Sequence, residues 1–227
     1  MSINGFLELP ALRINQERLK HLESLNLNIS NKTVTEYGAG PGLLTPYFIY
    51  KSCKIIALEG REENVKQFVT ENPNITVKQF DLEKTDWNEL QSTQIGFAYG
   101  LLYHLGNPKN FIEQAAKKTD EFLILETVVN EDKQAYSEHI VKEDTATETQ
   151  SLSGYGCRPS RQIVWDWFKE YFPYVYVPTT QPNHDEFPVQ FAERSFHTIR
   201  FIVIGSKTPI DNPLLSTTLL TTYTKLT

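Results

Sequence analysis

A glycine-rich segment, residues 38–42 (GAGPG), and the acidic side chains around it are the residues of this chain best suited to bind a ligand. Glycines let backbone N–H groups approach a ligand closely and adopt torsions that other residues avoid. Glu36 stands just before the segment, and Glu59 and Asp81 follow the next two apolar runs. A carboxylate at the end of the second strand of such a unit can accept hydrogen bonds from both hydroxyls of a ribose. The pattern therefore predicts a site for a nucleotide cofactor.

The residues on either side of the glycine segment predict the elements that hold it. Residues 32–37 are rich in β-branched and aromatic side chains, as in a short buried strand. Residues 43–50 begin a helix whose N-terminal N–H groups and dipole face the same ligand. Residues 54–58 form a second apolar strand that ends at Glu59. Strand, loop, helix and strand together form the unit expected around such a cofactor.

Two classes of cofactor use this geometry, and the spacing of the glycines separates them. A dinucleotide fingerprint, G-x-G-x-x-G, requires a third glycine where Leu43 stands. Glu36 would repel a pyrophosphate but suits a cationic ligand that carries an ammonium and a sulfonium group. These features favour S-adenosylmethionine (SAM). An NAD-dependent oxidoreductase remains the alternative, because the glycine segment and Glu59 also fit that class.

The segment resembles the first motif of the class I SAM-dependent methyltransferases, which consists of a hydrophobic strand, an acid and then G-x-G-x-G. The matching residues are Val34, Glu36, Gly38, Gly40 and Gly42. The resemblance implies that the protein binds SAM and that S-adenosylhomocysteine (SAH) is the product. It covers roughly residues 15–205 and is specific in the half of the chain that contains the cofactor motifs.

Two further motifs extend the resemblance. Asp81 and Leu82 follow the third strand where the family holds the adenine, although Asp81 can also cap the helix that follows. Residues 100–105 (GLLYHL) resemble the fourth motif of a subset that modifies small molecules or transfer RNA, and in that subset the motif lies beside the methyl group. The predicted cofactor-binding residues are Glu36, Gly38, Ala39, Gly40, Gly42, Glu59, Gly60, Asp81, Leu82, Tyr99, Gly100 and Tyr103.

Alternating strand and helix patterns predict an α/β fold, with a Rossmann-like, doubly wound, mostly parallel seven-stranded sheet and helices on both faces. Ligands of such sheets bind beyond the carboxyl ends of the strands. The predicted strands are residues 32–37, 54–58, 75–80, 95–99, 121–127, 174–177 and 201–204. The predicted helices are residues 11–26, 61–71, 110–118 and 160–172, the last capped by Ser160. The strand ends bring together Tyr37, Glu59, Asp81, Tyr99 and Glu126.

The chain is expected to form one SAM-binding methyltransferase domain over residues 1–227. Within residues 1–30, leucines at near-helical spacing predict an N-terminal helical lid or platform over the cofactor loop. Residues 128–160, which are polar and lack a strong strand pattern, and residues 179–196 are expected to be substrate-side insertions. The tail after Ser206 has no motif and is expected to be an edge element or frayed.

Methyl transfer requires a nucleophile held about 3 to 3.5 Å from the methyl group and, for an alcohol or a protonated amine, a group that removes a proton. His104 is the first candidate, because imidazole titrates near neutral pH. Alternatively, His104 hydrogen-bonds a loop carbonyl while Tyr103 packs against the cofactor. His184 is the second candidate, or else belongs to a solvated polar loop. Glu126 can accept a proton or bind the acceptor, or else anchors a loop.

The second half of the chain carries most of the predicted acceptor-binding residues. Arg158 and Arg161 can present guanidinium groups to a carboxylate or a phosphate, although Arg161 alternatively pairs with a nearby acid. Tyr103, His184 and Glu186 complete this set. The histidines and acids of the chain lack the local spacing of a metal site, so no metal is predicted.

Composition limits the partners of the protein. The 227 residues carry a net charge of −6, which disfavours a nucleic-acid surface because such binding depends on Lys and Arg. Two cysteines are too few for a disulfide framework and indicate a reducing compartment. No apolar run approaches the roughly 20 residues that cross a bilayer. We expect a cytoplasmic protein without a membrane partner, and the sequence is compatible with a homodimer.

Together these features predict methyl transfer from SAM to an oxygen or nitrogen atom of a small-molecule, natural-product or peptide-like metabolite. Three alternatives stay open besides this function. They are an NAD-dependent oxidoreductase, a non-catalytic SAM-binding partner protein, and a transfer-RNA-modifying methyltransferase, which the acidic balance of the chain disfavours.

Overall fold

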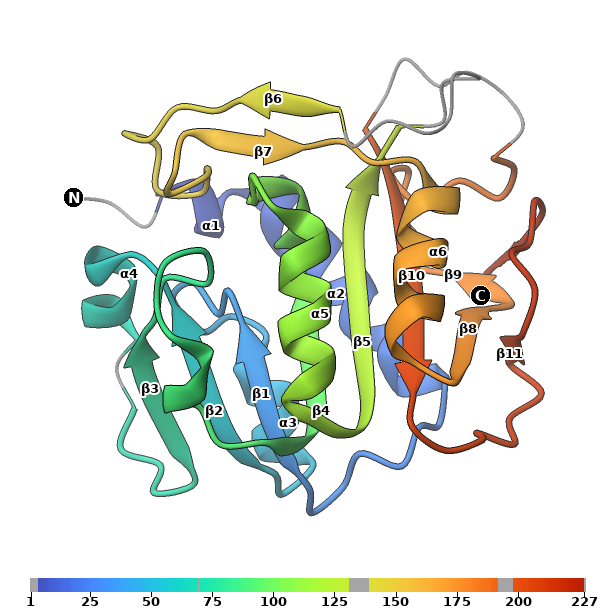
Figure 1. The fold of residues 1–227 in the computed structure, drawn as a ribbon, viewed down its shortest axis with the longest axis horizontal. Helices are drawn as coiled ribbons and strands as arrows, with labels where there is room; N and C mark the ends of the chain where they lie inside the picture. Colours follow the sequence, from blue (N-terminus) through green and yellow to red (C-terminus); the bar gives the residue numbers. More distant parts are fainter. Residues whose placement is uncertain (1–3, 69, 131–138, 192–197, 227) are drawn as a thin grey trace.

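An eight-stranded sheet runs through the centre of the molecule (Figure 1). The computed structural model describes residues 4–68, 70–130, 139–191 and 198–226. The strands of this sheet are β1 (Thr33–Tyr37), β2 (Lys54–Glu59), β3 (Ile75–Gln79), β4 (Thr93–Tyr99), β5 (Thr119–Val129), β8 (Tyr174–Pro178), β10 (Ile199–Ser206) and β11 (Leu215–Ser216). Their order is β11-β8-β10-β5-β4-β1-β2-β3.

The direction of the strands confirms the predicted doubly wound sheet. The five strands from β3 to β5 in this order are parallel to one another. β10 runs antiparallel to β5, and β8 runs antiparallel to β10. The eighth strand, β11, pairs with β8 at the edge. The tail thus adds one strand to the seven that were predicted.

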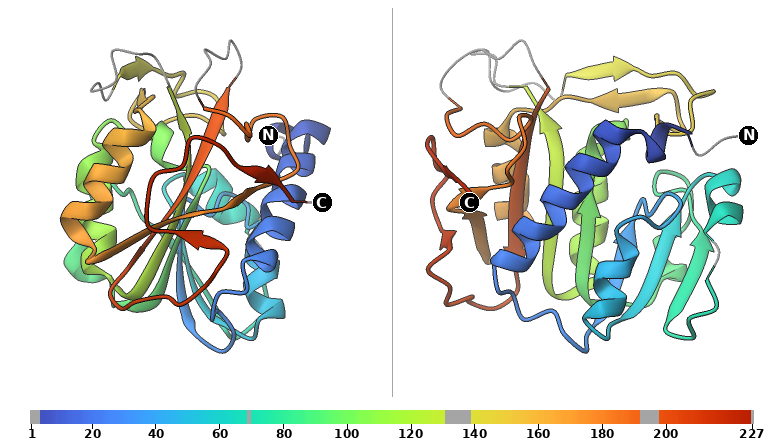
Figure 2. Two further views of the ribbon diagram at one scale, coloured as in Figure 1. Left: turned by 90° about the vertical axis from the view of Figure 1, so that its right-hand side faces the viewer. Right: turned by 180° about the vertical axis from the view of Figure 1, so that it is seen from behind.

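Helices cover both faces of the sheet (Figure 2). The α-helices are α1 (Asn4–Leu7), α2 (Leu9–Ser24), α3 (Thr45–Tyr50), α4 (Glu62–Gln67), α5 (Pro108–Lys117) and α6 (Arg161–Tyr171). Two short 3-10 helices are η1 (Trp87–Glu89) and η2 (Leu102–His104). α5 and α6 pack together on one face, and α2 and α3 lie on the other. None of the helices within the described ranges is both long and apolar enough to cross a bilayer.

The sheet separates two apolar cores, because successive side chains of a strand point to opposite faces. In β5, Leu125 belongs to the core that contains Phe111 of α5 and Phe168 of α6. Its neighbour Ile124 belongs to the core that contains Phe48 of α3. Both Ile124 and Leu125 are fully buried. The near-continuous apolar run of β5 is therefore the pattern of a central strand that is covered on both faces.

Local signals set the ends of the helices. Ser160 caps α6 as predicted, since its hydroxyl accepts a hydrogen bond from the backbone N–H of Ile163 at 3.3 Å. Asn107 caps α5 in the same way, and Pro108 occupies the first turn. The helix predicted over residues 61–71 is shorter than expected, because α4 ends at Gln67, six residues before Pro73.

The segment predicted to lack strong strands contains a hairpin. β6 (Ile140–Lys142) pairs antiparallel with β7 (Tyr155–Cys157), and the hairpin lies over the carboxyl edge of the sheet, at the top of Figure 1. Part of this segment, residues 131–138, and the end of the second insertion, residues 192–196, lie outside the described residues.

The C-terminal tail is an edge element. Its last strand, β12 (Thr224–Lys225), pairs with β9 (Thr180–Gln181), and the Asn212 amide donates a hydrogen bond to the backbone oxygen of Leu25 at 2.7 Å. The tail therefore packs against β9 and against the end of α2.

Candidate functional site

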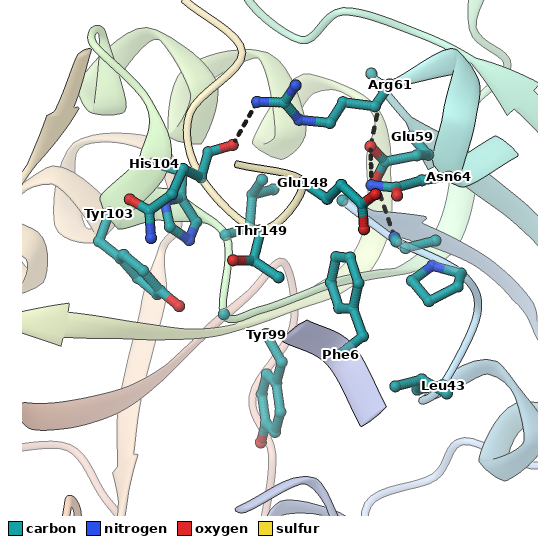
Figure 3. A pocket seen from close by; sticks show the side chains of 18 of the residues that line it. Phe6, Leu43, Glu59, Arg61, Asn64, Tyr99, Tyr103, His104, Glu148 and Thr149 are labelled. Atoms are coloured by element: carbon teal, nitrogen blue, oxygen red, sulfur yellow. Dashed lines mark hydrogen bonds between the residues drawn. The ribbon is translucent and has the colours of Figure 1, made fainter. Parts of the chain in front are cut away.

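A cavity of about 360 Å³ opens at the carboxyl edge of the sheet, where the predicted cofactor site was expected. The glycine segment, the ends of β2 and β4, and η2 line one side of it. α1, α2 and the loop between β6 and β7 line the other, and Figure 3 shows side chains from several of these elements around the space. The predicted cofactor residues that line the cavity are Gly38, Ala39, Gly40, Glu59, Gly60, Asp81, Leu82, Tyr99, Gly100 and Tyr103.

The glycine segment needs glycine for conformation and for space. Gly38 and Gly40 have φ angles of +68° and +54°, in the left-handed region that favours glycine. A Cβ on Gly38 would lie 2.7 Å from a methyl carbon of Leu101, and one on Gly40 would lie 3.1 Å from the ring of Phe6 in α1. The backbone of the glycine segment can therefore lie close to a ligand in the cavity.

Glu59 organises the backbone around the cavity. One carboxylate oxygen accepts a hydrogen bond from the N–H of Gly40 at 2.9 Å. The other accepts from the N–H of Arg61 at 2.9 Å and from the amide of Asn64 at 3.2 Å. Arg61 in turn donates to the backbone oxygens of residues 145, 150 and 151 at 3.0 to 3.1 Å. The end of β2 thus links the glycine segment to the loop that covers the cavity.

Asp81 lies at the cavity and also stabilises the backbone that follows it. It lines the cavity, and its carboxylate also accepts a hydrogen bond from the N–H of Glu83 at 3.0 Å, which stabilises the turn after β3. Glu83 lines the cavity as well and accepts from the N–H groups of Gly106 and Asn107. The adenine role of Asp81 and Leu82 stays a prediction.

Two predicted cofactor residues lie outside the cavity lining. Glu36 is buried and accepts a hydrogen bond from the hydroxyl of Thr45 at 2.6 Å, so it fixes the start of α3 instead of facing a cationic ligand. Burial raises its pKa to about 7, although the bond from Thr45 opposes the rise. Gly42, with a φ of +83°, shapes the turn against Phe68. Glu36 and Gly42 therefore stabilise the conformation of the glycine segment from outside the cavity lining.

Arg18 of α2 lines the cavity and was not among the residues predicted from the sequence. Its guanidinium donates to Glu126 at 2.5 Å and to Asn15 at 2.8 Å, and it lies against Gly100. Its Nε has no hydrogen-bond partner among the described residues. Ile14, Arg18 and Leu22 follow one another at intervals of four, so the helical period could have placed Arg18 on the buried face.

Glu126, a predicted catalytic candidate, lies in a buried ion pair instead of at the cavity. It is completely buried, does not line the cavity, and lies between Arg18 and the guanidinium of Arg200, which donates to it at 3.0 Å. Burial raises its pKa, but the two arginines outweigh burial and lower the pKa below the ordinary value. Arg200 also donates to Glu186 at 2.5 Å. Arg200 and Glu186 both line the cavity. Glu186, which was predicted to bind the acceptor, is therefore held at the cavity by its bond with Arg200.

His104 lies at the cavity and has an acidic partner. Its Nδ1 is 2.5 Å from a carboxylate oxygen of Glu143, the residue that directly follows β6. Glu143 also accepts from the N–H of Ser151 at 2.8 Å and from Arg158 at 3.1 Å. Burial raises the pKa of Glu143, but the bonds from His104, Ser151 and Arg158 outweigh it and lower the pKa. A carboxylate can only accept in this contact, so Nδ1 is the proton-bearing nitrogen; in the neutral imidazole the lone pair is then on Nε2.

Glu143 could not be found from the sequence, because it stands 39 positions from His104 in a polar segment without periodicity. His104 and Glu143 meet only because the hairpin of β6 and β7 packs over η2 in the folded chain.

The other predicted residues are placed as follows. His184 does not line the cavity; its Nδ1 accepts from the N–H of Glu186 at 3.2 Å and so stabilises a turn, and its role as a base stays a prediction. Arg161 is also outside: its guanidinium lies 3.7 Å from the ring centroid of Phe191 and donates to the backbone oxygen of Leu220. Arg158 lines a second cavity of about 270 Å³ that adjoins the first.

The cavity residues fit a SAM-like ligand. The glycine segment provides a cradle that side chains would fill, and Arg18 Nε and Tyr99 Oη are buried polar atoms without a hydrogen-bond partner within the described ranges. No group of three or more histidine, cysteine, aspartate or glutamate side chains in the described part of the chain could hold a metal ion.

Comparisons with known proteins identify the fold. No family model matches the chain, and no curated protein matches it. The N-terminal domain of EvdMO1, crystallised with SAH and D-fucose, is 21% identical over 85% of this chain and 82% of that chain, with a TM-score of 0.68. Magnesium protoporphyrin IX methyltransferase from Synechocystis, with bound SAH, is 12% identical over 90% of each chain, with a TM-score of 0.60.

A SAM-dependent methyltransferase from Mesorhizobium loti is 10% identical over 84% of this chain and 97% of that chain, with a TM-score of 0.58. The chain therefore shares the Rossmann-like fold of these methyltransferases.

Proposed function

We propose that the protein is a SAM-dependent methyltransferase that methylates a hydroxyl oxygen of a small molecule, with His104 as the general base. The observation that carries this proposal is the pairing of His104 with Glu143 at the cavity. The shared fold supports the cofactor class, and the His104 pair supports the choice of acceptor atom.

The cavity residues suggest how SAM would be held. Glu59 would bind the ribose: a carboxylate has about four acceptor positions, and three are used by Gly40, Arg61 and Asn64. One hydroxyl can use the position that remains, and a second can replace the amide of Asn64, which is the longest of the three bonds. Asp81 and the backbone of Leu82 would bind the adenine.

Arg18 would bind the carboxylate of the methionine part, since its guanidinium lines the cavity beside Gly100. When bound, SAM supplies a methyl group on a positively charged sulfur that is already activated for displacement.

The protein must then orient the acceptor and remove its proton. With Nδ1–H donated to Glu143, Nε2 of His104 can accept the proton of an acceptor hydroxyl. The imidazolium that forms would be stabilised by the Glu143 carboxylate, which Ser151 and Arg158 hold in place. A hydroxyl needs this help more than an unprotonated amine does, because the hydroxyl is the weaker nucleophile.

The first test combines cofactor binding with turnover. Purified protein should bind SAM and SAH in calorimetry and should form SAH with members of a panel of hydroxylated small molecules. His104→Ala should lower kcat by about 10²- to 10⁴-fold while the affinity for SAM stays within about threefold. The matched control is His184→Ala, because His184 lies outside the cavity lining; it should keep its turnover.

Three results would contradict the proposal. Binding of NADH without binding of SAM would favour the oxidoreductase. SAM binding without SAH formation across hydroxyl and amine acceptors would favour a non-catalytic partner protein. Turnover that requires transfer RNA would place the acceptor in another class.

A further inference from the structure

The second cavity adjoins the first on the side of His104. Five residues line both cavities: Tyr103, His104, Thr149, Gln150 and Arg200. The remaining residues that line the second cavity are Val128, Arg158 and Thr198. A molecule in the second cavity would therefore meet His104 without contacting the glycine segment or Glu59, which line the first cavity alone.

The two cavities differ in charge. Five acidic residues line the first cavity: Glu59, Asp81, Glu83, Glu148 and Glu186. The residues that line the second cavity include two arginines and a histidine but neither aspartate nor glutamate. Three acids pair with these arginines, and none of them lines the second cavity: the side chains of Glu126 and Glu143 are 0% and 3% exposed, and Glu186, which is 32% exposed, lines the first cavity. The surface offered to a ligand is therefore cationic, although the network behind it contains the balancing carboxylates.

Both arginines keep donors for a ligand. Arg158 donates through Nη1 to the backbone oxygens of Tyr103 and Cys157 and through Nη2 to Glu143. Arg200 donates through Nε to Glu186 and through Nη1 to Glu126. A guanidinium has five N–H donors, so Arg158 retains the Nε–H and one Nη2–H, and Arg200 retains one Nη1–H and both Nη2–H, with no acceptor among the described residues.

The bonds that are already made hold the two cations in position. Both guanidinium carbons lie near the ring of Tyr103, at 5.4 Å for Arg158 and 5.3 Å for Arg200. Such distances allow cation–π attraction. Because the arginines are fixed before a ligand arrives, a ligand loses less free energy to ordering them. Guanidinium donors arranged in this way match the oxygens of a carboxylate or a phosphate.

We propose that the second cavity binds the acceptor through an anionic group, a carboxylate or a phosphate, which Arg158 and Arg200 hold while the hydroxyl to be methylated faces His104. This inference rests on the proposed function, because it names the acceptor class of the same site. It assigns acceptor binding to Arg158, as predicted from the sequence, and also to Arg200, which was not predicted.

The test compares matched acceptors. Calorimetry on the SAH-saturated protein, repeated without SAH, uses 4-hydroxybenzoate against 4-hydroxybenzamide, glucuronate against glucuronamide, and glucose 6-phosphate against glucose. At least one anion should bind tenfold or more tightly than its neutral partner. A preference limited to the carboxylates or to the phosphate identifies the group. Equal affinity within every pair, or no binding by any compound, would overturn the inference.

Substitution of Arg158 tests whether this arginine causes the preference for the anion. Arg158→Gln should reduce the preference for the anion at least tenfold and leave the affinity for SAH within about threefold. Arg158→Lys should restore part of the preference, because it restores the charge but not the planar fork. Arg13→Gln is the control, since it removes the same charge from an exposed position of α2 outside both linings. An unchanged preference in Arg158→Gln would contradict the assignment.

The binding experiment separates this inference from the proposed function. Anion preference without SAH formation from any acceptor would support the anion site and contradict methyl transfer. SAH formation from neutral acceptors, with no anion preference, would support methyl transfer and overturn the anion site.

Discussion

Three glutamates whose side chains are at most 3% exposed show that, at the scale of single residues, the partners of a carboxylate decide its charge. Burial raises the pKa of Glu36, Glu126 and Glu143 alike. Glu36 has a hydroxyl as its hydrogen-bond partner, and its pKa rises to about 7. Two guanidinium groups lower the pKa of Glu126, and a histidine, an arginine and a backbone N–H lower that of Glu143. Glu126 and Glu143 can therefore serve as fixed anions.

Glu143→Gln tests the fixed anion beside His104. A neutral amide cannot stabilise the imidazolium and can also donate to Nδ1, which would select the wrong tautomer. We expect kcat to fall by about 10²- to 10⁴-fold, with the Kd for SAM unchanged within about threefold. Asp144→Asn is the control, because it removes the neighbouring exposed carboxylate, whose contacts are within its own loop. Equal kcat values for Glu143→Gln and the wild type would exclude His104 as an oriented base.

Glu36→Gln tests the raised pKa. The folded protein keeps this proton up to about pH 7, whereas the unfolded chain releases it near 4.5. The contribution of Glu36 to stability is therefore complete below pH 4.5 and is lost as the pH rises through 7. Glutamine avoids this loss, so the variant should gain up to about 3 kcal/mol over the wild type between pH 4.5 and pH 8.

Denaturant unfolding at pH 5 and pH 8 measures this difference. The comparison with the wild type is required because His21, whose pKa burial lowers to about 4, changes stability in the opposite direction. A constant difference between variant and wild type at both pH values would contradict the assignment.

At the scale of elements, the end of β2 joins three other pieces of the site. Glu59 holds the glycine segment and the start of α4, and Arg61 holds the loop between β6 and β7. A substitution at Glu59 therefore affects the backbone of the cavity as well as any direct contact with the cofactor. This is a wider role than the ribose contact that the sequence predicted.

Glu59→Gln should weaken SAM binding by about 2 kcal/mol, roughly 30-fold in Kd, through the loss of charge-assisted hydrogen bonds. Calorimetry with SAM and SAH measures the effect. Glu62→Gln removes an exposed carboxylate from the first turn of α4 and should leave the affinity unchanged. Wild-type affinity in Glu59→Gln would show that the carboxylate does not contact the cofactor.

At the scale of the whole molecule, one ionic network joins the two ends of the chain through the centre of the sheet. Arg18 in α2, Glu126 in β5 and Arg200 in β10 are each at least nine-tenths buried. Arg18 and Arg200 also line the cavity, so the arrangement of the N-terminal helix, the sheet and the last long strand fixes the shape of the site. Folding and site assembly are therefore coupled.

Glu126→Gln should reduce the free energy of unfolding by about 3 to 5 kcal/mol, because it leaves two buried guanidinium groups without their shared anion. Thermal and denaturant unfolding measure the loss. Glu113→Gln removes a surface carboxylate from α5 and should have no resolvable effect. A small effect of Glu126→Gln would mean that water or another acid takes over the pairing.

Much of the fold could be predicted because its signals are local. The apolar runs predicted all the long strands of the central sheet, and Ser160 predicted the start of α6. The hairpin of β6 and β7 and the edge strand β11 were missed because they are three and two residues long and are fixed by packing. Part of the cofactor side of the cavity was also predictable, since Gly38, Gly40 and Glu59 lie within one strand-loop-helix-strand unit.

The sequence by itself determined the sheet, the glycine segment and the acid at the end of β2, because these depend on neighbours in the chain and on a regular period. Only the tertiary structure decided which polar side chains meet. Arg18 and Glu126 are 108 positions apart, and His104 and Glu143 are 39 apart, so no periodic pattern links them. The same packing buried Glu36, which was expected to face the cofactor at the glycine segment. Side chains in irregular segments acquire their partners only when the chain is folded, and in this protein those partners give the site its charge.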